Sequence, residues 1–207
     1  MANLVITIGR ENGSGGRQLG SELAEALGVK CYDSELINET AKASGFAESF
    51  VQSHEEQRPG SFLYSLVTGG GVVADEQPFP VQIFQAQSEV IRTIAARESC
   101  IIVGRCSDSI LKCSKHLLRI FIYAPYKERL KNCVERLKMD ERTAKEMIRN
   151  VDRARDAYQV RYAGYLPGDF HHTDLLINSS FLGVEATAQY LTELVLKKYG
   201  SHHIEEV

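Results

Sequence analysis

The sequence lacks several features that would place it at once in a protein class. It has no run of about 18 apolar residues and no N-terminal signal segment, so we expect a cytoplasmic protein without a membrane span. The formal net charge is −3, which argues against a general nucleic-acid-binding protein. The five cysteines are odd in number and form no C-x-x-C pair, so we expect small buried side chains in a reducing compartment.

A glycine-rich stretch follows the first apolar segment. Leu4 to Ile8 is rich in β-branched residues and predicts a buried strand, and apolar residues at helical spacing begin at Leu19. Between these segments lie Gly9, Gly13, Gly15 and Gly16. Glycines allow backbone N–H groups to turn inward, and the N-terminus of a helix is positive, so this loop predicts a phosphate site. An ordinary glycine-rich connection is the alternative.

The loop lacks the lysine of the common phosphate-binding motif, G-x-x-x-x-G-K-[ST]. Gly16 occupies the lysine position and is followed by Arg17 and Gln18, neither of which has a hydroxyl group for magnesium. A dinucleotide-binding turn, G-x-G-x-x-G with an acidic residue about 20 positions later, is a second interpretation. Two glycines and Asp33 fit that pattern, but Gln18 stands in the third glycine position, so we rank it lower.

Apolar, strand-like segments alternate with helical patterns along the chain. The expected strands are residues 4–8, 29–32, 100–103, 117–124 and 175–177, and the expected helices are 19–27, 35–44, 81–97, 126–137, 143–161 and 184–199. This alternation predicts an α/β fold with a five-stranded parallel sheet and right-handed crossovers. The length of 207 residues suits one domain over residues 1–207.

Charged residues follow two of the predicted strands directly. Asp33 comes after the second strand and Arg105 after the continuous apolar run at residues 100–103. Because the carboxyl ends of parallel strands face the ligand crevice, both side chains are candidates for an acceptor site. A guanidinium there can bind a phosphate through two hydrogen bonds. The alternatives are a helix cap for Asp33 and a buried structural ion pair for Arg105.

Two stretches have few clear elements. Residues 46–80 are rich in turns and predict a flap on the acceptor side of the site, or else an irregular surface excursion. Residues 163–172 form a loop in which His171 and His172 are adjacent, a spacing that does not suit a metal site. Residues 200–207 are expected to be a frayed tail.

A long, highly charged helix is predicted before that loop. Thr143 and Glu146 have the spacing of a capping box, which places the helix start at Thr143. Its second half reads DRARDAYQVR. Charges of alternating sign are typical of a solvated face with weak ion pairs. The alternative is an arginine-rich lid, formed by the helix and loop of residues 140–172, that closes over phosphates.

Taken in order, these segments resemble the cytidylate kinase-like family, a branch of the P-loop nucleoside monophosphate kinases. The matching segments are ITIGRENGSGGRQLGSELAEAL, CYDSELI, IIVGRC, RIFIYAPYKER, DRARDAYQVRY and DLLINSSFLGVE. The resemblance implies a P-loop NTPase-like three-layer α/β/α fold with a mobile lid and an acceptor-side flap. It also implies ATP-dependent phosphoryl transfer, with Mg²⁺, to a nucleoside monophosphate, most readily CMP or dCMP.

The same resemblance implies roles for individual residues. The donor phosphates would be held by Gly13, Ser14, Gly15, Gly16, Arg17 and Gln18, and the acceptor by Asp33 and Arg105. Arg153 and Arg155 would belong to the lid, and Arg17 could take over part of the role of the missing lysine. Compared with true cytidylate kinases, Gly16 replaces the lysine, Gln18 the magnesium-binding threonine and Cys106 an acid. The alternative functions are a nucleotide-binding module without turnover and a kinase of another small acceptor. No residue is assigned as a direct metal ligand.

Overall fold

The computed structural model describes residues 3–33 and 79–200. The helix expected over 35–44, almost all of the flap expected over 46–80 and the tail after residue 200 lie outside the described residues. The last two residues assigned to the flap belong to a helix, α5, that begins at Phe79.

Five parallel strands form the centre of the protein. They are β1 (Leu4–Arg10), β2 (Lys30–Tyr32), β3 (Cys100–Val103), β4 (His116–Tyr123) and β5 (Leu175–Asn178). Their order across the sheet is β2-β3-β1-β4-β5, and each neighbouring pair is parallel. The predicted five-stranded parallel sheet is therefore confirmed. β1 lies in the middle, so the loop that follows it leaves the centre of the carboxyl edge.

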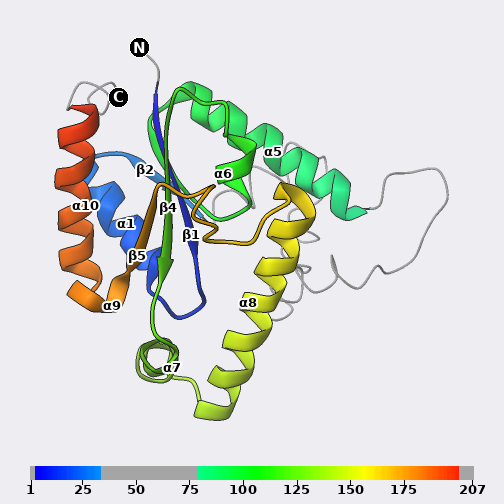
Figure 1. Cartoon of the computed structure of the whole chain (residues 1–207), viewed down its shortest axis with the longest axis vertical. Helices are drawn as coiled ribbons and strands as arrows, with labels where there is room; N and C mark the ends of the chain where they lie inside the picture. The colour runs from blue at the N-terminus through cyan, green and yellow to red at the C-terminus, as the bar shows by residue number, and fades with distance from the viewer. Residues whose placement is uncertain (1–2, 34–78, 201–207) are drawn as a thin grey trace.

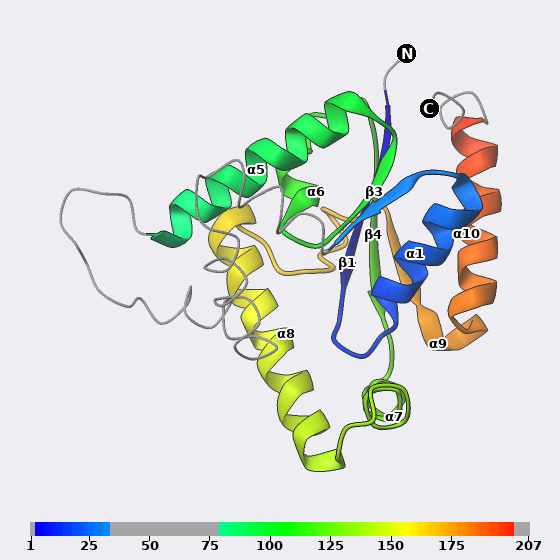
Figure 2. The same ribbon diagram turned by 180° about the vertical axis from the view of Figure 1, so that it is seen from behind.

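Helices cover both faces of this sheet (Figures 1 and 2). The helices are α1 (Gly16–Leu27), α5 (Phe79–Arg97), α6 (Ser107–Ile110), α7 (Tyr126–Glu135), α8 (Glu141–Ala163), α9 (Ser179–Leu182) and α10 (Val184–Tyr199). α1 and α10 pack side by side on one face, and α5 packs on the other. The three layers expected of an α/β/α fold are present.

The alternation of side chains along the buried strands produces these two apolar layers. Ile6 and Ile8 of β1 point toward α1 and α10, whereas Val5 points toward α5. In β3, Ile101 and Ile102 divide in the same way. A strand whose side chains are buried on both faces appears in the sequence as a continuous apolar run, which is why β1 and β3 were predictable.

The start of α8 differs from the sequence prediction. The helix begins at Glu141, and the side chain of Asp140 caps it by accepting a hydrogen bond of 3.0 Å from the Thr143 N–H. Thr143 is thus the third residue of the helix rather than its cap, and the predicted capping box is wrong. Asp140 is at least as good a capping residue as threonine, and it stands three residues earlier.

A polar network fixes the amino edge of the sheet. Glu98, between α5 and β3, accepts hydrogen bonds from Tyr32 (2.7 Å) and Arg97 (2.7 Å) and lies 2.9 Å from Lys30 Nζ. Burial alone would raise the pKa of Glu98, but these three partners outweigh it and hold the pKa at about 2. The network joins β2, α5 and β3 at the end of the sheet away from the glycine loop.

Candidate functional site

The glycine loop connects β1 to α1 and leaves the helix N-terminus without a side-chain cap. Gly13 and Gly15 both have φ of 79°, a left-handed conformation that glycine adopts readily. The first hydrogen bond of α1 runs from the Leu19 N–H to the Gly15 carbonyl, 2.9 Å. The N–H groups at positions 16 to 18 consequently have no acceptor within the helix. Such groups, together with the helix dipole, favour an anion.

Neighbouring elements hold the loop in this shape. Asn132 of α7 donates a hydrogen bond of 2.9 Å to the Gly13 carbonyl, and Ser179 Oγ donates one of 2.5 Å to the Ser14 carbonyl. A Cβ atom at Gly13 would lie 2.7 Å from the Arg129 carbonyl oxygen. In a trans peptide the C=O and the next N–H point in opposite directions, so the Gly15 N–H points away from Ser179.

The turn after β3 is a second unusual piece of backbone at the same edge. Gly104, Arg105 and Cys106 have φ of 81°, 60° and 53°, three consecutive left-handed residues. Left-handed backbone in a non-glycine residue costs roughly 1 kcal/mol or more and is concentrated at functional sites. The turn begins beside β1, because the Gly104 N–H donates to the Ile8 carbonyl at 3.0 Å. The glycine loop and this turn therefore leave neighbouring strands at the same edge.

Arginines from four segments gather around Asp33 at this edge. Asp33 Oδ1 lies 3.8 Å from Arg10 Nη2, and Asp33 Oδ2 contacts Arg17 Nε. Arg155 of α8 reaches the same place and donates a hydrogen bond of 3.0 Å to the Arg10 carbonyl. We call Arg10, Arg17, Arg105 and Arg155 the arginine cluster, since each of the last three lowers the pKa of Arg10 through its charge.

Burial and like charges act together on this cluster. Burial has the largest effect on the pKa of Arg10 and lowers it well below its usual value; Arg155 lowers it further, while Asp33 opposes the shift. Burial likewise lowers the pKa of Arg155, which Asp152 counteracts. Guanidinium groups held close together without enough carboxylates favour an anion with several charges. A phosphate or a chain of phosphates is such an anion.

One face of α8 supplies most of its contacts with this edge. Asp152 accepts a hydrogen bond of 2.7 Å from the Asn12 N–H of the glycine loop and pairs with Arg129 of α7. One turn later Arg155 binds the end of β1, and Gln159 then donates a hydrogen bond of 2.8 Å to Asp108 of α6. Positions three and four apart share a helix face. The charged sequence of α8 is thus more than a solvated surface.

Comparison with models of known protein families identifies the family of this chain. The cytidylate kinase-like family matches residues 5–181. The chain belongs to the cytidylate kinase-like family. Search among curated proteins gave no match. The family and the fold together support a phosphotransferase that uses a nucleotide.

Solved structures extend this likeness in shape. An uncharacterized protein from Eubacterium ventriosum ATCC 27560 is similar over 93% of this chain and 98% of its own, with a TM-score of 0.69 and 26% identity. Shikimate kinase from Acinetobacter baumannii, solved in complex with shikimate, is similar over 96% of each chain, with a TM-score of 0.53 and 15% identity. At that identity the likeness to shikimate kinase shows the fold alone, which is a P-loop kinase fold as expected. No helix in the described part of the chain is long and apolar enough to cross a membrane.

Some of the predicted site residues of this kinase-like protein lie near Asp33, and others lie away from it. Asp33 and Arg17 lie together, with Arg105 near enough to act on Arg10. Arg153 is exposed, although it stands only two positions from Arg155. The amide of Gln18 binds Glu22 and Arg136, at 2.7 and 2.6 Å, on the outer side of α1.

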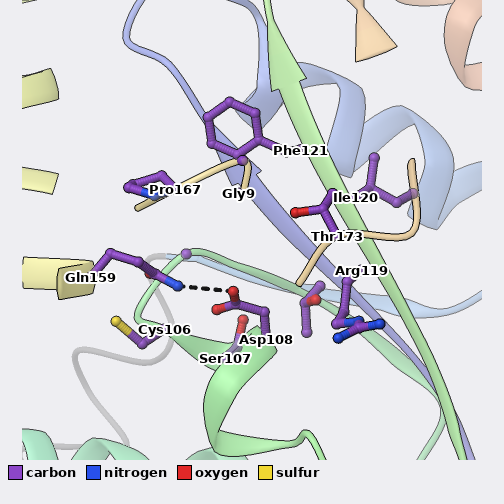
Figure 3. Close-up of a pocket in the computed structure, with 13 residues that line it drawn as sticks. Gly9, Cys106, Ser107, Asp108, Arg119, Ile120, Phe121, Gln159, Pro167 and Thr173 are labelled. Atoms are coloured by element: carbon purple, nitrogen blue, oxygen red, sulfur yellow. Dashed lines mark hydrogen bonds between the residues drawn. The ribbon is translucent and has the colours of Figure 1, made fainter. Parts of the chain in front are cut away.

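A small cavity lies on the same edge, between β1, β4, α6 and the loop before β5 (Figure 3). Its volume is about 40 Å³, and its lining includes Thr7, Gly104, Asp108 and Gln159. Ligand sites for small molecules usually enclose several hundred Å³. This cavity is therefore too small for a nucleobase, although its buried Thr7 hydroxyl, which has no hydrogen-bond partner in the structure, suits a water molecule.

The side chains of the described residues form no metal centre. Among residues 3–33 and 79–200 there is no group of three or more His, Cys, Asp or Glu residues that could hold a metal ion. His172 lies 3.2 Å from Asp169 and stacks on Tyr165, with ring centroids 3.8 Å apart. These contacts fix the loop before β5.

Sequence reasoning missed Arg10 and Asp152. The rule that selected Arg105, a charged residue at the carboxyl end of a buried strand, applies equally to Arg10, which ends β1. The predicted strand ends at Ile8, which leaves Arg10 inside the glycine-rich loop instead of at the end of a strand. No local signal identifies Asp152, since its partner Asn12 is 140 residues away in sequence.

Proposed function

We propose that this protein transfers the γ-phosphoryl group of ATP to a nucleoside monophosphate, with CMP and dCMP as the first candidates. The observation that carries the proposal is the common location of two features at the carboxyl edge of the sheet. These are a glycine loop with an uncapped helix N-terminus and the arginine cluster around Asp33. Phosphoryl transfer depends chiefly on positioning and on cancelling phosphate charge, which such features provide.

The proposal includes roles for individual residues. The donor phosphates are assigned to the loop formed by Gly13, Ser14, Gly15, Gly16, Arg17 and Gln18, and the acceptor is assigned to Asp33 and Arg105. Arg17 and Arg155 are the proposed sources of positive charge during transfer, and Arg153 is assigned to the lid. The segment 140–172 serves as the lid and 46–80 as the acceptor flap, within one domain. Nucleotides are the proposed partners, in the cytoplasm, with no part for nucleic acid or membranes.

Magnesium enters this proposal as part of MgATP. The loop offers no serine or threonine at the position where related loops have a metal-binding hydroxyl, and the Gln18 amide is engaged by Glu22 and Arg136. The residues of this loop therefore do not form a protein site for the ion. Mg²⁺ commonly keeps several waters and binds through substrate phosphates, which is compatible with this loop.

One observation favours a second candidate, a nucleotide-binding module without turnover. The loop has no lysine, and Arg17 is paired with Asp33 rather than directed at the loop. A protein of this kind would bind ATP through its backbone and arginines but would not accelerate transfer. A kinase of another small acceptor is the third possibility, and shikimate, bound by the similar shikimate kinase, represents it in the test.

The test is an acceptor screen with binding measured in parallel. MgATP is combined with each common ribo- and deoxyribonucleoside monophosphate and with shikimate. A coupled assay follows ADP formation, and calorimetry measures binding of each nucleotide and of shikimate. The proposal predicts acceptor-dependent ADP formation, largest with CMP or dCMP. ATP binding without acceptor-dependent turnover would favour the binding module, and turnover with shikimate alone would favour another acceptor class.

A further inference from the structure

The absent lysine leaves open which group supplies fixed positive charge beside the donor phosphates. We propose that Arg10 is that group: it contacts the transferring phosphoryl and stabilises its charge. This inference rests on the proposed function, and it concerns a residue to which the sequence analysis assigned no role.

Arg10 extends between the two pieces of unusual backbone. At its base, a Cβ atom on Gly16 would lie 2.6 Å from the Arg10 Cβ. At its tip, a Cβ atom on Gly104 would lie 2.0 Å from Arg10 Nη1. The side chain therefore begins against the residue in the lysine position and ends against the turn that carries Arg105. In the proposed assignment these are the donor side and the acceptor side.

The absence of side chains at two glycines makes room for Arg10. A side chain at Gly104 would displace the guanidinium from its present position, and a side chain at Gly16 would collide with the Arg10 Cβ. Gly16 stands where the common motif has lysine. The glycine at the lysine position therefore also lets Arg10 pack against the first turn of α1.

Arg10 is also held more firmly than the other candidate cation. Its side chain is 16% exposed, whereas that of Arg17 is 72% exposed. Its backbone carbonyl accepts the hydrogen bond from Arg155, and its guanidinium lies 3.8 Å from Asp33. A cation fixed before the substrate arrives needs little reorganisation during the reaction, which is the condition for strong electrostatic stabilisation.

Phosphoryl transfer requires only that Arg10 offset the charge on the phosphoryl oxygens. The bond between the γ-phosphorus and the β–γ bridging oxygen breaks, and a bond forms between that phosphorus and an acceptor phosphate oxygen. Charge spreads over the three equatorial oxygens meanwhile. A guanidinium can donate two hydrogen bonds to phosphate oxygens and stays protonated, so Arg10 neither gives nor takes a proton.

The experiment compares Arg10→Ala and Arg10→Gln with the wild type and with Arg149→Ala, which removes an exposed arginine of α8. Steady-state kinetics with MgATP and the best acceptor should show kcat and kcat/KM falling together by about 100-fold or more in both Arg10 variants. Arg149→Ala should behave as the wild type. Circular dichroism melting checks the fold, and Arg10→Gln keeps the test valid if the alanine variant does not fold.

The outcomes separate this inference from the proposed function. If the wild type is active and either folded Arg10 variant keeps kcat within about threefold, the inference is overturned and the proposed function stands. If the wild type turns over no acceptor, the proposed function fails, and calorimetry with inorganic tripolyphosphate decides about Arg10. Affinity at least about tenfold weaker in the variants would support Arg10 as the anion-binding cation, and unchanged affinity would overturn it.

Discussion

Arg155 and Arg153 show how closely the site depends on single positions. Two residues apart on a helix, they point roughly 200° away from one another. Arg155 binds the Arg10 carbonyl, and Arg153 is exposed. We expect Arg155→Ala to lower kcat by about 10- to 100-fold, because a preorganised charge near the phosphates is lost. Arg153→Ala should change kcat by less than about threefold, because an exposed charge contributes little. Kinetics of the matched pair checks this, and equal losses would contradict it.

Arg105 should act on the acceptor rather than on the donor. It stands in the left-handed turn at the end of β3, on the far side of Arg10 from the glycine loop. Arg105→Ala should weaken binding of the monophosphate by about 1.5–3 kcal/mol, the range for hydrogen bonds to charged groups. Affinity for ATP should stay nearly the same. Calorimetry with each nucleotide separately measures both effects, and a loss shared equally by the two would count against the assignment.

The glycine loop is the element on which the donor site depends. Gly13 and Gly28 have similar left-handed φ values, 79° and 68°, but only Gly13 is crowded, by the Arg129 carbonyl. Gly28→Ala should cost about 1 kcal/mol of unfolding free energy through backbone strain alone. Gly13→Ala should cost at least about 2 kcal/mol and also weaken ATP binding. Urea unfolding of the two variants gives the comparison. Equal costs would show that crowding in the loop is not important.

The Glu98 network gives a pH-dependent prediction for the opposite edge of the sheet. The pKa of Glu98 is lowered to about 2, so its stabilising effect is fully present above the unfolded pKa and is lost as the pH falls through the folded one. Glu98→Gln should lower the unfolding free energy by about 1–2 kcal/mol at pH 7. The difference from the wild type should shrink between roughly pH 4.5 and 2. Glu25→Gln, at an exposed position of α1, is the control; a difference independent of pH would refute the network's role.

The elements differ in how well the sequence predicts them. Buried strands such as β3 appear as unbroken apolar runs, so the strands and their parallel direction could be predicted from the pattern, whereas the order of the strands could not. The predicted start of α8 was wrong. Thr143 and Glu146 have the sequence spacing of a capping box, but in the structure Asp140 is the capping residue. Caps depend on where the chain turns, which a local pattern specifies only within a few residues.

The residues of the candidate site also differ in how well the sequence predicts them. Asp33 and Arg105 were found because parallel topology alone brings strand ends together. Arg10 was missed because its importance comes from contacts with Gly104 and Arg155, which lie far away along the chain. Such contacts depend on how α8 packs against the sheet, and the alternating charges of α8 gave no sign of which face would be inside.

At the scale of the whole molecule, one edge of the sheet collects residues from distant parts of the chain. The glycine loop, the turn after β3 and the inner face of α8 meet there, and Asp152 ties α8 to both the loop and α7. Positive charge concentrates at this edge although the chain as a whole carries a net charge of −3. A protein with this distribution is suited to bind small, highly charged anions rather than long polyanions.

The central claim is that a phosphoryl group passes from ATP to a nucleoside monophosphate at this edge, and label transfer tests it most directly. Purified protein in excess over [γ-³²P]ATP is mixed with Mg²⁺ and CMP, or with the best acceptor from the screen, and the products are separated by chromatography. The account predicts label in the nucleoside diphosphate, with little in inorganic phosphate, because the site positions an acceptor for transfer. Label that stays in ATP, or that appears only as inorganic phosphate, would contradict it.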